Sequence, residues 1–377
     1  MKVIGIIAEY NPFHLGHEYQ IKKIKELYPE SIIIAIISTH FTQRGDISII
    51  NKWDKTEICL TEGIDMVVEL PTIYATQSAD RFAYGALAIL NKFKIDTLVF
   101  GSESNNIEEL VSLAKTQINN HEYDNKVKEY LNLGINYPTA MSKALEEMTN
   151  IKIDTPNDLL ALSYIKEIIK NNYPITPVSI ERTNNYHGKE INDEKIISAN
   201  LIRKLISEKK DISNYIPEIT SKYINYNLSL NNAYNYLIYN IINNRDNLKL
   251  FLDVDEGLDG RILKKIEMSS SWNQLVMNIK SKRYTYNKIN RMLVHLLLNI
   301  KKSDNNNEIY LRILGFNQKG KKYLNKIKKN IDLPIHTNYK KGLDKNMDIE
   351  YYTTYIYGII TDNLEILKKE KEKPIIY

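Results

Sequence analysis

The strongest constraint on this chain is its opening, where an apolar run ends in Asn-Pro-Phe and is followed at once by His-x-Gly-His. The run Val3–Ala8 predicts a core strand, and a helix is expected from about Glu18. Because Gly16 has no Cβ, a purine or phosphate can lie against the backbone there. The free N–H groups of the following helix attract phosphate. His14 and His17 can donate hydrogen bonds to oxygens that gain charge as pyrophosphate leaves.

Other phosphate-binding motifs are missing from the sequence. The chain contains neither G-x-x-x-x-G-K-[ST] nor G-x-G-x-x-G. A histidine pair near a strand end can also be a metal site or a chance match. Metal binding needs further ligands, and one cysteine (Cys59) and seven histidines make a closed zinc site improbable. We therefore predict nucleotide binding and no metal site.

Residues 1–210 alternate between apolar runs and helical patterns, which predicts a doubly wound α/β domain with a parallel sheet. Ligands of such sheets bind beyond the carboxyl ends of the strands. The expected strands are Val3–Ala8, Ser31–Ser38, Met66–Leu70, Thr97–Gly101 and Thr176–Arg182. The expected helices are Glu18–Leu27, Ala79–Asn91, Ile107–Thr116, Thr139–Met148 and Asn157–Lys170, of which the last two look inserted before the final strand.

Residues 211–377 predict a second, mainly α-helical domain, which suits a chain of 377 residues. Apolar positions recur at helical spacing in Ala233–Ile242, Leu258–Met268 and Asn290–Ile300. A further unit reads as a strand, a basic helix and a short extended piece at Ile309–Phe316, Gly320–Lys329 and Pro334–Thr337.

The net charge of +5 hides a division between these halves. Residues 1–210 carry 24 Lys and Arg against 28 Asp and Glu, a net of −4, whereas residues 211–377 carry 27 against 18, a net of +9. Residues 261–330 alone carry 17 against 3, a net of +14. This excess favours a polyanionic partner such as nucleic acid, although a solvated helical face remains the alternative.

Composition also bears on where the protein works. No run of about 18 apolar residues is present, so no transmembrane helix and no membrane partner is expected. The first residues have the pattern of a core strand and not that of a signal peptide. A single cysteine excludes an internal disulfide and favours a reducing, cytoplasmic location. Nothing in the sequence indicates a protein partner.

Two motifs elsewhere in the first half add cations to the expected site. Arg44 precedes a glycine after the second strand and can clamp phosphate or carboxylate, with Lys52 and Lys55 adding charge to the same rim. Ser198 can cap a helix and touch a phosphate, and Arg203 lies one to two turns further along. The alternatives are a surface arginine in the first case and an ordinary N-cap with a solvated arginine in the second.

Two segments of the second half suit nucleic acid. Lys282, Arg283 and Tyr284 interleave cations with an aromatic ring, and Arg291 follows on the next helix. Such a pattern fits phosphate contacts and base stacking, or a plain helix start with buried tyrosines. Lys321 and Lys322 lie in a dense basic helix. We predict that these residues bind nucleic acid.

These motifs together resemble the bacterial tRNA(Met) cytidine acetate ligases. The resemblance begins with Ala-Glu-Tyr-Asn-Pro-Phe-His-Leu-Gly-His at residues 8–17 and spans essentially the whole chain in order. It continues through Gln-Arg-Gly at 43–45, Val-Glu-Leu-Pro at 68–71, Phe-Gly-Ser-Glu at 100–103, Lys-Arg-Tyr-Thr at 282–285 and Leu-Gly-Phe-Asn at 314–317. The chain departs from the family at Ser38-Thr39-His40, where a Ser-Gly pair is usual, and around Asn157, where Ser-Asn-Asn is common.

The resemblance implies that the protein activates acetate with ATP as acetyl-adenylate and passes the acetyl group to N4 of the wobble cytidine of elongator tRNA(Met). His14 and His17 would be catalytic, Mg²⁺ would accompany ATP, and Ser198 and Arg203 match the phosphate-contacting serine and Ile-Arg of the broader nucleotidyltransferases. The ATP-binding residues implied are Ile7, Ala8, Glu9, Tyr10, Asn11, Pro12, Phe13, His14, Leu15, Gly16, His17, Glu18, Tyr19, Gln20, Gly101, Asn157 and Arg182.

Two rival functions remain at the level of sequence. A small-molecule nucleotidyltransferase would share the first domain but would not need a basic second domain. A catalytically silent RNA-binding protein would not need intact His14, Gly16 and His17.

Overall fold

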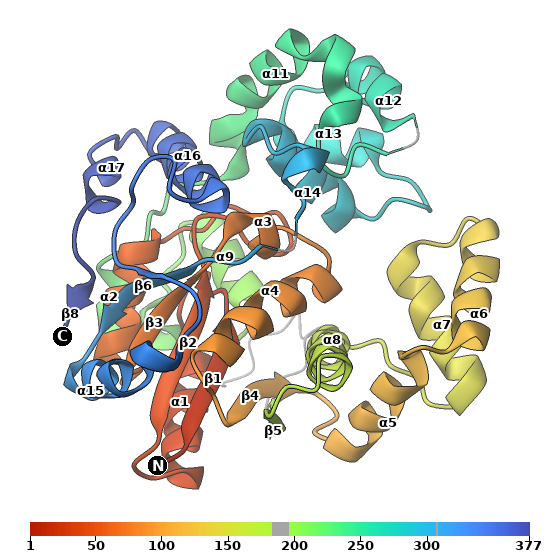
Figure 1. Cartoon of the computed structure of the whole chain (residues 1–377). Helices are drawn as coiled ribbons and strands as arrows, with labels where there is room; N and C mark the ends of the chain where they lie inside the picture. Colours follow the sequence, from red (N-terminus) through yellow and green to blue (C-terminus); the bar gives the residue numbers. More distant parts are fainter. Residues whose placement is uncertain (183–195, 256, 307) are drawn as a thin grey trace.

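The described residues form one eight-stranded sheet, to which both halves of the chain contribute strands (Figure 1). The structure, a computed structural model, describes residues 1–182, 196–255, 257–306 and 308–377. The strand order is β5-β4-β1-β2-β3-β6-β7, with β8 also paired to β6. The strands are β1 (Val3–Ala8), β2 (Ile32–Ser38), β3 (Met66–Leu70), β4 (Thr97–Ser102), β5 (Thr176–Glu181), β6 (Leu311–Phe316), β7 (Ile335–His336) and β8 (Ile375–Ile376).

The first five strands are parallel, and helices cover both faces of the sheet. In β2 the odd and even residues divide between two cores: Ile32, Ile34 and Ile36 pack in one cluster, Ile33 and Ile37 in the other. A strand buried on both faces reads as a continuous apolar run, which is why this segment was recognisable. The predicted doubly wound α/β fold is confirmed.

Most helices of the first half begin and end close to their predicted positions, whereas α2, α3 and α6 were not predicted. The helices up to β5 are α1 (Leu15–Leu27), α2 (Lys52–Thr61), α3 (Thr72–Ala75), α4 (Ala79–Lys92), α5 (Ile107–Gln117), α6 (His121–Asn132), α7 (Tyr137–Thr149) and α8 (Pro156–Lys170). Helix α1 begins three residues earlier than expected because His14 caps it. Helices α5 to α8 form the insertion between β4 and β5.

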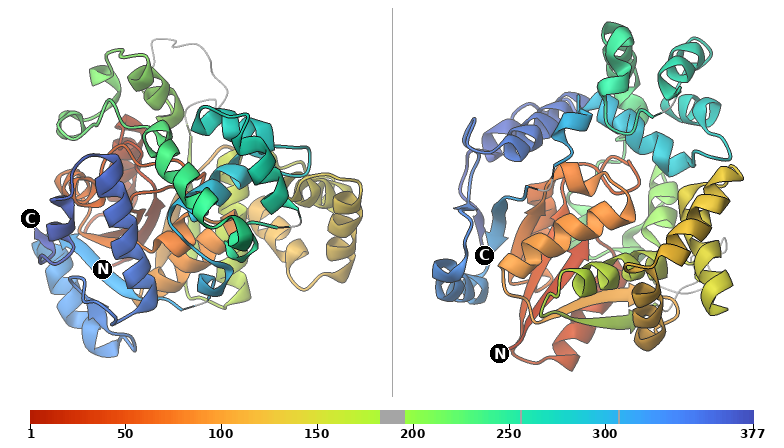
Figure 2. Two further views of the ribbon diagram at one scale, coloured as in Figure 1. Left: turned by 90° about the horizontal axis from the view of Figure 1, so that it is seen from above. Right: turned by 45° about the vertical axis from the view of Figure 1, so that its right-hand side comes forward.

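A helical unit, α11 to α14, lies above the carboxyl ends of the parallel strands (Figures 1 and 2). The remaining helices are α9 (Ala199–Ser207), α10 (Glu218–Ser221), α11 (Tyr234–Asn243), α12 (Leu258–Ile266), α13 (Trp272–Ile279), α14 (Tyr286–Leu297), α15 (Gln318–Ile327), α16 (Lys345–Ile360) and α17 (Ile366–Lys369). Short 3-10 turns cover Ser213–Tyr215, Leu230–Ala233, Arg245–Leu250, Lys302–Asp304 and Lys328–Asn330.

The predicted division at residue 210 does not separate two independent units. Strand β6 lies in the second half of the chain and pairs antiparallel with β3 of the first half, with Met66 opposite Phe316. The helical unit ends before β6, and the chain then returns to complete the sheet. Local sequence patterns predict a strand near 309–316, but they do not reveal which distant strand it pairs with.

A buried ion cluster joins this returning segment to the sheet. It consists of Lys52 on α2, Glu69 on β3, Arg312 on β6, Glu350 on α16 and Glu370 after α17. Lys52 Nζ lies 2.6 Å from Glu69 and 2.7 Å from Glu370, and Arg312 lies 2.5 Å from Glu370. Every one of these side chains is at most 2% exposed. A fragment ending near residue 210 would therefore leave Lys52 and Glu69 without most of their partners.

Candidate active site

A cleft of about 660 Å³ opens at the carboxyl ends of β1 and β4, where the strand order reverses direction. This switch point is where ligands bind in open α/β sheets. Its walls include the His-x-Gly-His loop, the loop after β2, the ends of β4 and β5, the start of α4, the inserted helices α7 and α8, and the beginnings of α9 and α14. The sequence predicted the first three contributions and that of α9. It did not predict that α14 closes the cleft.

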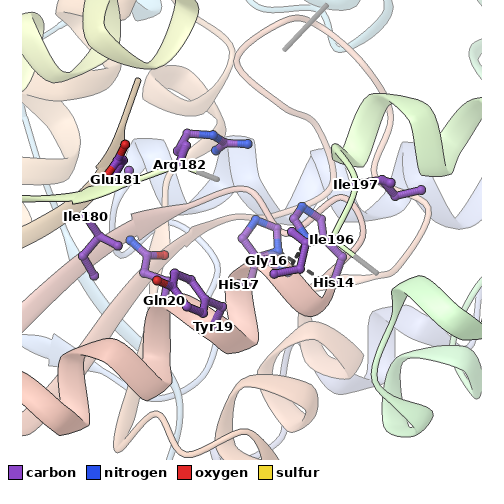
Figure 3. Close-up of a pocket in the computed structure, with 11 residues that line it drawn as sticks. His14, Gly16, His17, Tyr19, Gln20, Ile180, Glu181, Arg182, Ile196 and Ile197 are labelled. Carbon is purple, nitrogen blue, oxygen red and sulfur yellow. Dashed lines mark hydrogen bonds between the residues drawn. The ribbon is translucent and has the colours of Figure 1, made fainter. Parts of the chain in front are cut away.

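The two histidines are held side by side by the start of α1 (Figure 3). His14 is the N-cap residue, and its Nδ1 accepts a hydrogen bond of 3.0 Å from the Gly16 backbone N–H. The His14 backbone N–H in turn donates to Nδ1 of His17 at 3.2 Å. The ring centroids are 3.8 Å apart. Because Nδ1 is an acceptor in both rings, a neutral imidazole carries its proton on Nε2.

Electrostatics keep these rings neutral. Burial lowers the pKa of His14 to about 3, and the nearby Arg182 and Arg203 lower it further in the same direction. Burial, His14 and Arg182 likewise lower the pKa of His17 well below its ordinary value. Both side chains line the cleft. The pair therefore offers two preorganised Nε2–H donors, and not two cations, to an anionic ligand.

A smaller pocket lies beside the histidines. It is lined by Gly16, Gly101, Ile180, Arg182, Ile196 and Ile197, among others (Figure 3). A Cβ on Gly16 would lie 2.8 Å from the His14 ring and 3.2 Å from Ile196, and one on Gly101 would lie 3.2 Å from Arg182. Both glycines thus keep this surface open, as the sequence predicted for Gly16.

Asn157 and Arg182 meet in a short polar relay. Arg182 Nη1 lies 3.5 Å from Asn157 Oδ1, and Asn157 Nδ2 donates to Glu103 at 2.5 Å. Asp158, buried beside them, accepts from Ser102 and from the backbone N–H groups of Glu103 and Ser104. The unusual Thr-Pro-Asn-Asp sequence at 155–158 therefore still brings Asn157 to the cleft with Gly101 and Arg182.

Ser198 and Arg203 approach the histidines from the other side. Ser198 is the N-cap of α9, its Oγ accepting from Leu201 N–H, and it lines the cleft. Arg203 Nη1 donates to the Asn11 carbonyl at 2.8 Å, and its Nη2 lies 3.4 Å from Asp46. The arginine is therefore fixed at the cleft wall by the loop itself, and both residues line the same cleft as His14 and His17.

Not every residue of the predicted ATP loop faces the cleft. Asn11 is 3% exposed and ties the loop to the next one, donating to Ile47 O and accepting from Ile49 N–H. Phe13 is fully buried and packs on Tyr10 and His17. The loop residues absent from the linings of both pockets are Pro12, Phe13, Leu15 and Glu18. Glu18 instead pairs with Lys22 along α1.

The loop after β2 is joined to α14 in a way that the sequence did not reveal. Gly45 has φ of +79°, and a Cβ there would lie 2.7 Å from the Arg291 backbone nitrogen. Asn290 is fully buried and donates to the Arg44 carbonyl at 3.0 Å. Arg291 lies 3.4 Å from the Gln43 carbonyl and lines the cleft. Gly45 was the one local hint of this contact in the sequence, because a glycine often marks a place where two backbones approach closely.

Lys52 and Lys55 are not at the rim where the sequence analysis placed them. Lys52 and Glu69 belong to the buried ion cluster. Lys55 is 1% exposed and its Nζ donates to the carbonyls of Glu9 and Ser38, at 3.0 and 2.6 Å. It thus holds the ends of β1 and β2 together from below the cleft. His40 is also buried, stacked on Tyr357 with its Nε2 3.1 Å from Thr354.

The predicted tRNA-binding residues separate into three places. Lys282 and Arg283 are exposed and Tyr284 half-buried in the loop before α14, whose first turn contributes Thr285 and Asn287 to the cleft. Arg291 is half-buried inside the cleft. Lys321 and Lys322 are exposed on α15, which follows β6 and starts at the amino ends of the parallel strands (Figure 1). They therefore lie at the edge of the sheet opposite the cleft.

Two features are absent from the described residues. Across residues 1–182, 196–255, 257–306 and 308–377, no helix is long and apolar enough to span a membrane. Over the same ranges, no three His, Cys, Asp or Glu side chains gather in a way that could hold a metal ion.

Comparison with known proteins places this geometry in a family. The model of the HIGH Nucleotidyl Transferase family matches residues 1–372. A tRNA(Met) cytidine acetate ligase from Thermoanaerobacter sp. is 38% identical and one from Clostridium novyi 35% identical, with the match covering all of this chain and 100% and 99% of theirs.

Solved structures agree with the sequence relatives. Thermotoga maritima TmcAL without ligand matches with a TM-score of 0.90 at 29% identity, covering 100% of this chain and 99% of that one. The same protein bound with alpha-thio ATP matches with a TM-score of 0.87 at the same identity and coverage. The resemblance carried by the sequence motifs is confirmed, and the chain belongs to the tRNA(Met) cytidine acetate ligase family.

Proposed function

We propose that this protein uses ATP to activate acetate as acetyl-adenylate and transfers the acetyl group to N4 of the wobble cytidine of elongator tRNA(Met). The observation that carries the proposal is the pair of neutral histidines capping α1 beside Arg182, Ser198 and Arg203 in one cleft. The relatives named tRNA(Met) cytidine acetate ligase support the tRNA and the acyl group, and the ATP-analogue complex of TmcAL supports the nucleotide.

In the first step an acetate oxygen attacks the α-phosphorus of ATP, and pyrophosphate leaves. His14 and His17 donate Nε2–H bonds to phosphate oxygens that gain charge. Arg203 and Ser198 hold the triphosphate from the α9 side, and Arg182 and Gly101 border the pocket that suits the adenine ring. Neutral imidazoles fit this role because their Nε2–H groups are already in place at the site before negative charge develops on the phosphate oxygens.

Mg²⁺ enters in this proposal as part of the substrate. A triphosphate carries more charge than Arg182 and Arg203 neutralise, and Mg²⁺ is usually held by substrate phosphates with few protein carboxylates. The described residues contain no dedicated three-ligand cluster, which fits an ion that arrives with the nucleotide. Its chemistry would be to neutralise the leaving pyrophosphate.

In the second step the N4 amine of cytidine attacks the acetyl carbonyl carbon and AMP leaves. This amine is a weak nucleophile, so positioning by the docked tRNA must supply much of the rate. Lys282 and Arg283 are exposed beside the α14 end of the cleft and suit contacts to phosphates near the anticodon. Arg291 lies deeper, where it suits the reacting nucleotide or the phosphates of ATP.

The test is incubation of the protein with ATP, acetate and total bacterial tRNA, followed by nucleoside mass analysis. N4-acetylcytidine should form only when all three substrates are present, and sequencing of the modified tRNA should identify elongator tRNA(Met). Consumption of ATP and acetate without tRNA modification would favour a small-molecule adenylyltransferase. Binding of tRNA without pyrophosphate release would favour a silent RNA-binding protein.

A further inference from the structure

The second step of the proposed reaction releases a proton, and one residue of the cleft is placed to take it. When N4 bonds to the acetyl carbon and the bond from that carbon to the phosphate oxygen breaks, AMP leaves with the electron pair. The N4 nitrogen must then lose a proton to give the neutral amide, and a base must accept that proton. We propose that Glu9 is this general base, an inference that rests on the function proposed above.

Glu9 occupies the centre of the site. It follows the last residue of β1, the strand between β4 and β2, at the point where the sheet reverses its order. Its side chain is half-buried and lines the cleft together with His14 and His17. Oε1 accepts a 2.5 Å hydrogen bond from the Gln43 backbone N–H. Among the described residues, no hydrogen bond reaches Oε2, so one carboxylate oxygen of this cleft-lining residue remains as an acceptor.

The other titratable groups around the cleft are unsuited to accepting a proton. His14 and His17 already use Nδ1 as an acceptor for backbone N–H groups, which leaves Nε2–H as a donor. Asp46 lies 3.4 Å from Arg203 and 3.4 Å from Asn290 Nδ2. Asp80 pairs with Lys166. Glu9 combines a free acceptor with a position at the switch point.

Neighbouring charges from four elements set how Glu9 titrates. The pKa of Glu9 is raised from its ordinary value, mainly by burial and to a smaller extent by the negative charge of Asp46. The hydrogen bond from the Gln43 N–H and the positive charges of Arg44 and Arg203 lower the pKa, but they do not outweigh burial. Lys55 approaches its backbone carbonyl from α2, and Tyr164 on α8 lies near enough for Glu9 to raise that phenol's pKa. A raised pKa makes the carboxylate a stronger base, which suits general base catalysis.

The test separates the two steps in Glu9→Gln, which keeps an oxygen for the Gln43 N–H but cannot take a proton. Acetate-dependent exchange of labelled pyrophosphate into ATP reports the first step, and single-turnover transfer from preformed acetyl-adenylate to tRNA reports the second. We expect exchange to stay within about threefold of wild type, and transfer to fall by roughly 10²-fold or more. Retained exchange also shows that the variant is folded.

Three further measurements sharpen the result. Wild-type transfer should rise with pH up to the pKa of Glu9 and then level off, and this rise should disappear in Glu9→Gln. Glu9→Asp, which restores the carboxylate on a shorter side chain, should regain part of the transfer rate. Glu62→Gln, a half-buried glutamate outside the cleft whose pKa is also raised by burial, should leave both rates unchanged.

The outcomes that overturn the inference differ from those that overturn the function. Equal loss of exchange and transfer in Glu9→Gln would show that Glu9 serves the ATP site, for example through Mg²⁺. That result would contradict the general-base role of Glu9 but not the proposed function. An unchanged transfer rate in Glu9→Gln would also contradict the general-base role and leave the proposed function standing. Wild-type protein that exchanges pyrophosphate but never acetylates tRNA would contradict both the proposed function and this inference.

Discussion

The cleft and the buried ion cluster use the same kinds of charged residue for opposite purposes. In the cluster, Lys52 and Arg312 are matched by three carboxylates and shielded from water. In the cleft, Arg44, Arg182, Arg203 and Arg291 line one cavity with few carboxylates beside them. A set of charges that satisfies itself stabilises the fold, whereas a set with excess positive charge is ready for an anion. The balance of charge within each set, and not residue type, distinguishes the two.

The largest effect should come from breaking the cluster. Burial alone would lower the pKa of Lys52, but Glu370, Glu69 and Glu350 outweigh it and raise the pKa, so the ammonium is retained. In Lys52→Met the three carboxylates would face Arg312 alone, and we expect a loss of about 3–5 kcal/mol in the free energy of unfolding. Urea denaturation of the variant and the wild type measures this change in the free energy of unfolding.

Lys22→Met is the control for that variant, because Lys22 is exposed on α1 and pairs with Glu18 one turn away on the same helix. It should change stability by no more than about 0.5 kcal/mol. If Lys52→Met were as stable as the control, the cluster would not be what holds the returning segment to the sheet.

Within the cleft, the next largest effect is expected at the histidine pair. His17→Ala removes one preorganised donor and should cut acetate-dependent pyrophosphate exchange by roughly 10²–10³-fold, with little change in melting temperature. His121→Ala, an exposed histidine at the start of α6, is the matched control and should be silent. Near-normal exchange by His17→Ala would remove this residue from catalysis.

Arg203 tests whether the arginines that line the cleft bind the nucleotide. Arg203→Gln should weaken ATP binding by about 1.5–3 kcal/mol, the usual value of a hydrogen bond to a charged group, as measured by calorimetry. Lys204→Gln on the same helix is exposed and should bind ATP normally. Equal affinities in the two variants would mean that Arg203 only fastens the loop through Asn11 and Asp46.

The smallest effect concerns the two exposed basic segments of the second half. Lys282→Ala with Arg283→Ala should weaken tRNA binding several-fold and reduce the slope of affinity against salt by about 1–2, while sparing ATP binding. Lys321→Ala with Lys322→Ala, at the opposite edge of the sheet, should leave both unchanged. The reverse result would place tRNA along α15 and not beside the cleft.

Local patterns predicted much of the fold and the centre of the site. Strands β1 and β3 have the predicted bounds because continuous apolar runs need no distant partner to be recognised. His14, Gly16, His17, Gly101, Arg182, Ser198 and Arg203 converge because they lie at strand ends or helix starts on one edge of the sheet.

What local patterns could not predict depends on pairings between distant residues. Lys52 and Arg44 are both cations near the end of β2, yet one is buried against Glu370 and the other lines the cleft. Lys52 is buried because the segment from β6 to Glu370 returns to the sheet and brings two of its carboxylate partners, and no local pattern around Lys52 reveals that return. Likewise, the +14 segment is one block in sequence but is divided in space between the cleft and the far edge of the sheet.

The most direct test of the account follows the oxygen atoms of acetate. With acetate labelled by ¹⁸O at both oxygens, attack on the α-phosphorus leaves one labelled oxygen bridging carbon and phosphorus. When N4 displaces AMP, that oxygen stays with the phosphate. The account therefore predicts AMP carrying a single ¹⁸O, formed in step with N4-acetylcytidine. Unlabelled AMP, or ADP as the product, would contradict an acetyl-adenylate made in this cleft.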